Sequence, residues 1–247
     1  MNIVELTSAA AIHDAAALLD RIWRVDGGRR VIDADLVCAL AHTGNYVVGA
    51  YDGPTLVGAS VGFFAEDGHL HSHVTGVDPA YQDRHVGRAL KFHQRDWALA
   101  RGRSTISWTF DPLIARNAYF NLHTLGARVI EYLPDFYGSL DDGINVGDAS
   151  DRLYVVWPLD AAPLPAPTAA DVPARLSRDG DEPRSASTTG PTFTVATPPD
   201  ITRLRATDHA LAVRWRMAVR EALTTALSRG YRIGGITRDG HYLLERR

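Results

Sequence analysis

Three histidines alternate with other residues in the segment HLHSHVTGV, at positions 69, 71 and 73. Successive side chains of a β-strand point to opposite faces, so this spacing predicts that His69, His71 and His73 share one face of a strand. The other face is then expected to carry Leu70, Ser72 and Val74. Imidazole titrates near neutral pH and can remove a proton from an incoming nucleophile, which makes this face a candidate for general base catalysis.

Two other interpretations of the histidine face stay open. Polar residues of a strand can simply form hydrogen bonds beside a cleft without taking part in chemistry. Two imidazoles at His-x-His spacing can also bind one metal ion, provided that a third ligand such as Asp111 comes from elsewhere in the chain.

A second segment, VDPAYQDRHVGRAL over residues 77–90, has the pattern of a strand end, a turn and the start of a helix. The first N–H groups of a helix and its dipole together form a site for an anion such as a pyrophosphate. Gly87 lets a ligand come close to the backbone, and Arg84 and Arg88 can add charged hydrogen bonds. An ordinary strand-to-helix connection is the alternative interpretation.

A third group of candidates follows the segment STISWTF at residues 104–110. Trp108 and Asp111 lie at the end of this expected strand, where side chains commonly line a ligand site. A carboxylate there attracts a cationic amine, so Trp108 and Asp111 are predicted substrate-binding residues.

The elements that must position these residues follow from periodicity and turn signals. Alternation predicts strands at residues 2–6, 45–51, 55–65, 69–77, 104–110, 127–133 and 152–159. Apolar residues at helical spacing predict helices at residues 8–25, 33–42, 83–103 and 117–125. This order predicts an α+β (mixed α/β) domain over residues 1–160.

The composition changes after this domain. Residues 161–200 are rich in Pro, Ala, Ser and Thr, which predicts a flexible linker. A helix over 206–229 and a hairpin around Asp239 are expected in the last part, 201–247. The segment 201–247 is too short to bury a large core by itself. We therefore expect a helix–hairpin appendage that docks on the first domain or on a partner subunit, and a homodimer is one possible assembly.

Composition excludes several classes of partner. The formal net charge of −3 argues against nucleic-acid binding, which favours a basic excess. No apolar run is long enough to span a membrane, and the first residues lack the pattern of a secretory signal. Cys38 is the single cysteine and cannot form an internal disulfide. These features predict a cytoplasmic protein that binds neither nucleic acid nor membrane.

The turn segment resembles the acyl-CoA motif of the GNAT superfamily of N-acetyltransferases, Arg/Gln-x-x-Gly-x-Gly/Ala preceded by Val-x-Pro. Here the motif reads QDRHVG after VDP, and the order of elements across residues 2–159 is similar. The segments LHSH, ALKFHQRDWALARG and WTFDPL resemble one branch of this superfamily. The resemblance implies a GNAT-like fold with a central, mostly antiparallel sheet flanked by helices.

The resemblance also implies which residues bind acetyl-CoA or another acyl-CoA. The predicted contacts are Val77, Gln82, Asp83, Arg84, His85, Val86, Gly87, Arg88 and, on the short helix, Asn117. The strands at 69–77 and 104–110 would splay apart to admit the pantetheine arm. His85 departs from the family pattern, because it stands where the motif has its first glycine.

The activity implied by the resemblance is transfer of an acetyl group from acetyl-CoA to a primary amine of a small molecule, by direct attack in a ternary complex. Backbone N–H groups near residues 74–76 would polarise the thioester carbonyl. His71 takes the place of a general base eleven residues before Gln82, and His73 is a second candidate. Leu122 replaces the tyrosine that acts as general acid in many members, and Tyr119 is the nearby phenol.

No metal is expected for this reaction. Two alternatives from other classes stay open. One is a GNAT-like module that binds acyl-CoA or a partner without catalysis. The other is a metal-dependent hydrolase built on His69, His71 and His73.

Overall fold

The computed structural model describes residues 1–25, 29–138, 147–163, 165–169, 171–188 and 190–246. These residues form two compact units, and the boundary between them falls after Trp108, inside a strand. The first unit therefore ends well before residue 160, where the sequence predicts the end of the first domain.

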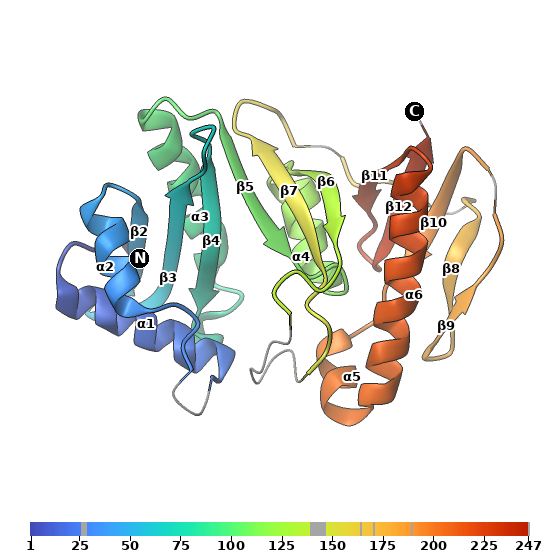
Figure 1. Ribbon diagram of the computed structural model, residues 1–247, viewed down its shortest axis with the longest axis horizontal. Coiled ribbons are helices and arrows are strands. Elements are labelled where there is room, and N and C mark those ends of the chain that lie inside the picture. Colours follow the sequence, from blue (N-terminus) through green and yellow to red (C-terminus); the bar gives the residue numbers. More distant parts are fainter. Residues whose placement is uncertain (26–28, 139–146, 164, 170, 189, 247) are drawn as a thin grey trace. The chain divides into compact units, whose positions relative to one another are not determined.

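The first unit is built on one sheet (Figure 1). Its neighbouring strands, in order, are β1 (Asn2–Glu5), β2 (Tyr46–Asp52), β3 (Thr55–Phe64), β4 (Leu70–Val77) and β5 (Thr105–Phe110). Neighbours from β1 to β4 are antiparallel, whereas β4 and β5 are parallel. The sheet is thus mixed and mostly antiparallel, as the sequence predicts.

Helices cover both faces of this sheet. They are α1 (Ala9–Trp23), α2 (Ala34–His42) and α3 (Val86–Ala100), with a short 3-10 turn η1 (Pro79–Tyr81) before α3. A Cβ atom on Gly76 would lie 2.7 to 2.9 Å from side chains of α1, whereas one on Gly58 would lie 3.2 to 3.3 Å from side chains of α3. Because Gly76 pairs with Ala59, the neighbour of Gly58, the two glycines face opposite sides of the sheet. Helices α1 and α3 therefore lie on opposite faces.

A β-bulge interrupts β4 in the middle of the histidine segment. Val61 of β3 pairs with Val74, and the next residue, Gly62, pairs with Ser72, so His73 is an extra residue. The bulge changes which face the later side chains occupy. Ser72 bonds to a residue of α3, whereas Val74 packs in the core against residues of α1. The expectation that Val74 shares a face with Ser72 is therefore wrong.

The second unit begins with the end of β5. It continues with α4 (Ala115–Tyr119), a π-helical turn η2 (Phe120–Thr124), and the antiparallel pair β6 (Arg128–Leu133) and β7 (Arg152–Pro158). The short helix and both strands lie where the sequence predicts them. Only the change to π-helical geometry at Phe120 is unexpected.

The predicted flexible linker at 161–200 is wrong over residues 174–196, where three strands form. They are β8 (Ala174–Asp179), β9 (Glu182–Ser185) and β10 (Thr192–Ala196). With β11 (Tyr231–Ile236) and β12 (His241–Arg246) they make a sheet in the order β11-β12-β10-β8-β9. The predicted C-terminal hairpin is present, but it belongs to this sheet.

Two helices precede the C-terminal hairpin, where the sequence predicts one, and the second of them packs on this sheet. They are α5 (Ile201–Thr207) and α6 (His209–Ser228). They separate at Asp208, whose side chain accepts a hydrogen bond from the N–H of Leu211 and so caps α6. Trp215 of α6 is fully buried and donates from Nε1 to the Asp181 carbonyl at 2.8 Å, which attaches α6 to the turn between β8 and β9.

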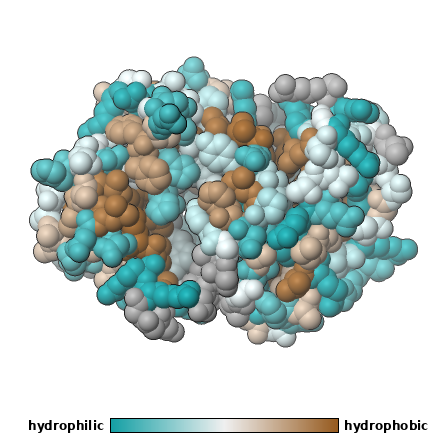
Figure 2. Space-filling model, viewed as in Figure 1, coloured by the Kyte–Doolittle hydropathy of each residue, from teal (hydrophilic) through white to brown (hydrophobic). Residues whose placement is uncertain are grey.

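The surface is mixed in character. Polar residues cover much of the face shown in Figure 2, with apolar residues in smaller groups among them. Across the described residues, the helices include none with the length and apolar content that a membrane crossing requires.

Candidate functional site

The predicted histidine face contains a chain of polar contacts. Ser107 Oγ on β5 lies 2.9 Å from Nδ1 of His71 and 2.8 Å from Nε2 of His69. Nδ1 of His69 in turn contacts the carboxylate of Asp67. Phe63 of β3 packs beside His71 and His73, with ring centroids 5.2 and 5.8 Å away. The structure therefore brings the three histidines together and links two of them through a serine.

The surroundings of His71 favour a neutral imidazole. Burial lowers the pKa of His71 to about 4, and the charges of His73, His69 and Lys91 act in the same direction. At neutral pH the ring therefore carries no net charge and can accept a proton. Because Nδ1 is engaged by Ser107, Nε2 is the nitrogen left for a substrate.

The three histidines do not form a metal site in this arrangement. Among the described residues no group of three or more His, Cys, Asp or Glu side chains is placed to hold a metal ion.

Strands β4 and β5 pair only over a short stretch. Among the described residues, their paired positions are Leu70 with Ile106 and His71 with Ser107. The next residues are Ser72 and Trp108, and both are buried. The parallel pairing thus ends beside the histidine cluster.

A lysine of α3 lies at this end of the pairing. Nζ of Lys91 donates to Ser72 Oγ at 2.8 Å and lies 4.1 Å from the ring centroid of Trp108. Trp108, a predicted substrate-binding residue, is thus 5% exposed and in contact with an ammonium group. Lys91 and Ser107 were not among the predicted site residues. Their contacts come from neighbouring elements, which a local sequence pattern does not show. The one sequence feature that could have pointed to Lys91 is that it is the only lysine of the chain.

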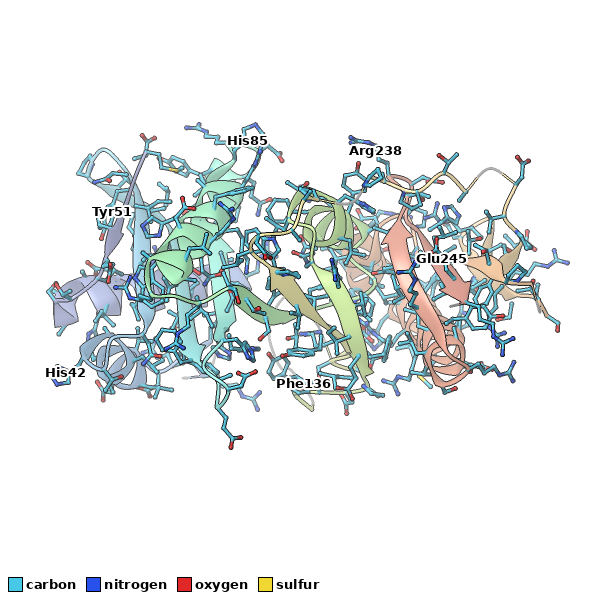
Figure 3. The ribbon with its side chains drawn as sticks, turned by 90° about the horizontal axis from the view of Figure 1, so that it is seen from above. His42, Tyr51, His85, Phe136, Arg238 and Glu245 are labelled. Atoms are coloured by element: carbon cyan, nitrogen blue, oxygen red, sulfur yellow. The ribbon has the colours of Figure 1, made fainter. Side chains whose placement is uncertain are left out.

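The predicted pyrophosphate segment forms the turn between β4 and α3. His85 is the N-cap of α3 and adopts φ 61°, in the left-handed region, without a capping side-chain bond. This conformation accounts for the glycine that the family motif has here, because a Cβ atom is strained in it. The His85 side chain is exposed and lies at the outer surface (Figure 3).

The other residues of this turn leave the backbone open. A Cβ on Gly87 would meet only Val77, at 3.8 Å, so the space beside it is free of close contacts. The guanidinium groups of Arg84 and Arg88 are exposed and lie over the rings of Tyr81 and Phe92, at 4.8 and 5.3 Å. Together with the first N–H groups of α3, they provide donors suited to a phosphate.

The remaining residues of this segment differ in exposure. Gln82 and Asp83 are exposed, and Asp83 also has a positive φ of 64°. Val86 is buried, at 3% exposure, so it offers a ligand its backbone N–H but not its side chain.

Two predicted site residues belong to the second unit. Asn117 is exposed on α4. Tyr119 is half-buried, with the ring of His123 at 5.0 Å and the guanidinium of Arg238 at 4.8 Å. Tyr119 is therefore held by an aromatic and a cationic neighbour within its own unit.

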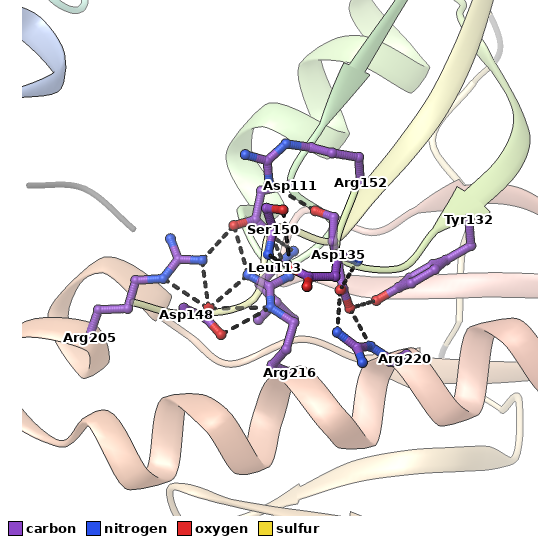
Figure 4. Close-up of polar contacts among 11 residues, drawn as sticks. Asp111, Leu113, Tyr132, Asp135, Asp148, Ser150, Arg152, Arg205, Arg216 and Arg220 are labelled. Carbon is purple, nitrogen blue, oxygen red and sulfur yellow. Dashed lines mark hydrogen bonds and ion pairs between the residues drawn. The ribbon is translucent and has the colours of Figure 1, made fainter. Parts of the chain in front are cut away.

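Asp111, the other predicted substrate residue, lies in a buried ion cluster of the second unit (Figure 4). Its carboxylate accepts from Arg205 Nη2 at 2.6 Å and from Arg216 Nη1 at 2.8 Å. Asp148 accepts from the same two arginines, each at 2.9 Å. A substrate-binding role for Asp111 does not match this arrangement, because two arginines of α5 and α6 already occupy the carboxylate.

The electrostatics of this cluster agree with a structural role. Burial alone would raise the pKa of Asp111, but Arg216 and Arg205 outweigh it and hold that pKa well below its usual range. Beside this cluster, Asp151 accepts from Tyr132 at 2.5 Å and from Arg220 at 2.5 Å. These contacts attach α6 to the strands β6 and β7.

Comparisons with known proteins agree with this geometry. Residues 12–122 match the model of the acetyltransferase (GNAT) family. No curated protein sequence matches the chain. Among solved structures, the ribosomal-protein-S18-alanine N-acetyltransferase of Escherichia coli is similar with TM-score 0.51 and 17% identity, covering 65% of this chain and 95% of that one.

Two further solved structures are similar over nearly their whole length. A putative acetyltransferase of Salmonella typhimurium with its cofactor acetyl-CoA has TM-score 0.52 and 18% identity, covering 68% of this chain and 99% of that one. Aminoglycoside 6'-acetyltransferase type Ii has TM-score 0.51 and 19% identity, covering 68% and 100%. At these identities the likeness shows the fold.

Proposed function

We propose that this chain, whose residues 12–122 match the model of the acetyltransferase (GNAT) family, transfers an acetyl group from acetyl-CoA to a primary amine of a small molecule. The observation that carries the proposal is the environment of His71. A neutral imidazole with one free nitrogen lies where the pairing of β4 and β5 ends.

The turn between β4 and α3 fits the phosphates of acetyl-CoA. Its donors are the first backbone N–H groups of α3 with Arg84 and Arg88, and Gly87 leaves the backbone accessible. Gln82, Asp83 and His85 are exposed beside these donors, and Val77 ends the preceding strand. Asn117, on α4, stays a prediction from the resemblance. No metal is part of this proposal.

In the proposed reaction, acetyl-CoA supplies an acyl group activated as a thioester. Nε2 of His71 removes a proton from the amine as its nitrogen attacks the thioester carbon. When His71 takes up the proton, its Nδ1–H donates to Ser107, Ser107 O–H donates to His69, and His69 donates to Asp67, so each of these donors has an acceptor. This series of hydrogen bonds ends at the exposed carboxylate of Asp67, so the positive charge on His71 is shared with groups nearer the solvent.

His73 and Tyr119 are proposed as secondary catalytic groups. His73 is the residue added by the bulge in β4 and is more exposed than His71. Its place beside Phe63 puts a second imidazole on the face that carries the base. Tyr119 keeps its predicted position on the short helix.

A small-molecule amine is the proposed acceptor, and the similar aminoglycoside 6'-acetyltransferase supports this choice. The similar S18-alanine N-acetyltransferase of Escherichia coli makes a protein N-terminus the alternative acceptor. A cytoplasmic location and a homodimer stay predictions from the sequence.

The test combines binding with turnover. Calorimetry with acetyl-CoA is expected to show binding, and an amine panel is expected to release CoA thiol. His71→Ala should lower turnover strongly and leave the dissociation constant of acetyl-CoA almost unchanged. An unchanged rate would remove His71 as the base.

A non-catalytic acyl-CoA-binding module is the second candidate, because His85 stands at the glycine position and Leu122 at the tyrosine position. Leu122 is 4% exposed and packs as a core residue. Binding of acetyl-CoA without thiol release across the amine panel would support this module and contradict the proposed enzyme.

A further inference from the structure

Lys91 is the only lysine of the chain, and it is buried, with 8% of its surface exposed. Its ammonium donates to Ser72 Oγ at 2.8 Å and to Gln94 Oε1 at 3.4 Å. An ammonium has three N–H donors, so one remains after these two bonds. On a third side, the ammonium lies 4.1 Å from the centroid of the Trp108 ring.

The charge of Lys91 has no anionic partner among the described residues. Its neighbours are a hydroxyl, an amide oxygen and an aromatic ring, and burial lowers its pKa to about 7. A buried charge is ordinarily paired, because leaving water is costly for it. In the second unit, the buried Arg205 and Arg216 are each paired with Asp111 and Asp148. Lys91 is therefore arranged to meet an anion that the described residues do not supply.

The place of Lys91 indicates where such an anion would come from. Ser72 and Trp108 directly follow the last paired residues of β4 and β5, so the ammonium lies where the two strands cease to pair. His71 precedes Ser72, so the two side chains leave β4 on opposite faces. The imidazole and the ammonium thus lie on the two sides of one strand.

We propose that Lys91 is a catalytic acid, whose ammonium contacts the sulfur of the acyl thioester and protonates the departing thiolate. This inference rests on the proposed function. As the amine nitrogen bonds to the carbonyl carbon, the carbon–sulfur bond breaks and its electron pair goes to sulfur. A proton from Nζ converts the thiolate to the thiol. Lys91 then regains a proton from solvent, and the proton removed by His71 returns to solvent.

The titratable groups that act on this region come from β4. His71 lies across the strand from Lys91, and the charge of Lys91 lowers the pKa of His71. His69 and His73 share the face of His71. From β5, Ser107 contacts His71 and Trp108 contacts Lys91, and neither side chain titrates in the physiological range. A protonated Lys91 therefore also helps to keep the base neutral.

The test compares ligands that differ only at the sulfur. Calorimetry measures the dissociation constants of CoA, desulfo-CoA and acetyl-CoA for the full chain and for Lys91→Met, which replaces the ammonium by an uncharged, unbranched side chain one atom shorter. The full chain is expected to prefer CoA over desulfo-CoA by about tenfold or more at pH 8, because the thiol of CoA can pass its proton to the neutral amine of Lys91 and so form a charge-assisted ammonium–thiolate contact. Lys91→Met should lose this preference and keep its affinity for acetyl-CoA.

A matched variant controls for general charge. Arg95→Met removes one positive charge one turn along the same helix, from a half-buried guanidinium that pairs with Asp96, and should leave the preference for CoA unchanged. Ultraviolet absorption of bound CoA gives a second measurement, since more thiolate should be present with the full chain than with Lys91→Met.

An equal preference for CoA over desulfo-CoA in the full chain and in Lys91→Met would overturn the role of Lys91. Absence of binding by all three ligands would instead overturn the proposed function, and this inference with it.

Discussion

Ser107 Oγ lies 2.9 Å from Nδ1 of His71, which leaves Nε2 as the nitrogen that can face a substrate. Ser107 is fully buried, so no solvent molecule replaces its hydroxyl when the side chain is shortened. We expect Ser107→Ala to lower kcat by about tenfold, because it disconnects His71 from His69. This loss is smaller than the loss expected when a general base itself is removed. The acetyl-CoA dissociation constant should not change.

Steady-state kinetics and calorimetry check this expectation. The decisive comparison is Ser107→Ala introduced into a His71→Ala background. Residues that act as one unit are not additive, so the serine change should then have almost no further effect on kcat. A full additional loss would show that Ser107 acts independently of His71.

The acidic limit of activity should lie far below the ordinary titration of histidine. Burial and the neighbouring charges lower the pKa of His71 from 6.5 to about 4, so the ring is neutral and able to accept a proton above about pH 4. NMR titration of the histidine ring protons should show one signal with a midpoint near this value, and His71→Gln should remove that signal. A midpoint near 6.5 for the assigned ring would contradict the buried environment of His71.

Lys91→Met should stabilise the protein, because it removes a buried ammonium that lacks an anion. The folded state lowers the Lys91 pKa from 10.5 to about 7, a difference that corresponds to roughly 5 kcal/mol. Between these values the unfolded chain holds the proton and the folded chain does not, so Lys91 lowers stability most at pH 7 and below. The stabilising effect of the substitution should shrink as pH rises towards 10.5.

Urea unfolding of both proteins across this pH range measures the effect. Because the chain has one lysine, labelling lysine with ¹³C gives one Cε signal, whose titration reports the pKa of Lys91 directly. A titration near 10.5, or a Lys91→Met protein less stable than the full chain at pH 7, would contradict the buried and unpaired state of the ammonium.

Much of the first unit could be predicted from the sequence, since its strands and helices have regular periods. The histidine segment became β4, and the turn before Gly87 became the start of α3. The bulge at His73 was not predicted, because alternation assumes a strand without extra residues. For the same reason Val74 was assigned to the wrong face. Lys91 and Ser107 were missed because their partners come from other elements, which no local pattern shows.

The strands of the second sheet were missed for a different physical reason. β9 carries the sequence EPRS and packs mostly polar side chains, so its local composition resembles a linker. β8 and β10 become strands through pairing with each other and, for β10, with β12 far along the chain. Buried residues such as Leu176 and Phe193 are too few and too scattered to reveal this pairing in the sequence.

Asp111→Asn should destabilise the second unit strongly. The change leaves Arg205 and Arg216 buried with one carboxylate, Asp148, in place of two. Breaking a buried ion pair by removing one partner costs about 3 to 5 kcal/mol. Glu182→Gln is the matched control, since Glu182 pairs with Arg214 at 2.7 Å on the surface and such exposed pairs contribute about 1 kcal/mol or less.

Urea unfolding followed by tryptophan fluorescence compares the two variants, because Trp215 lies in α6 close to the cluster in sequence. Similar losses for Asp111→Asn and Glu182→Gln would show that the cluster contributes no more than a surface pair. A stable Asp111→Asn protein with weaker amine binding would return Asp111 to the role of a substrate ligand.

His85→Gly should be tolerated and should stabilise the start of α3. His85 adopts φ 61°, a conformation that costs a residue with a Cβ atom about 1 kcal/mol and costs glycine little. Arg24→Gly is the matched control, because Arg24 has φ 52° at the C-terminal end of α1 and is not one of the proposed phosphate donors. Both variants should raise the melting temperature by a similar amount.

If His85 obstructs the phosphates, only His85→Gly should also tighten acetyl-CoA binding, and calorimetry of the two variants separates these effects. Weaker binding by His85→Gly would show instead that the imidazole itself contacts the phosphates.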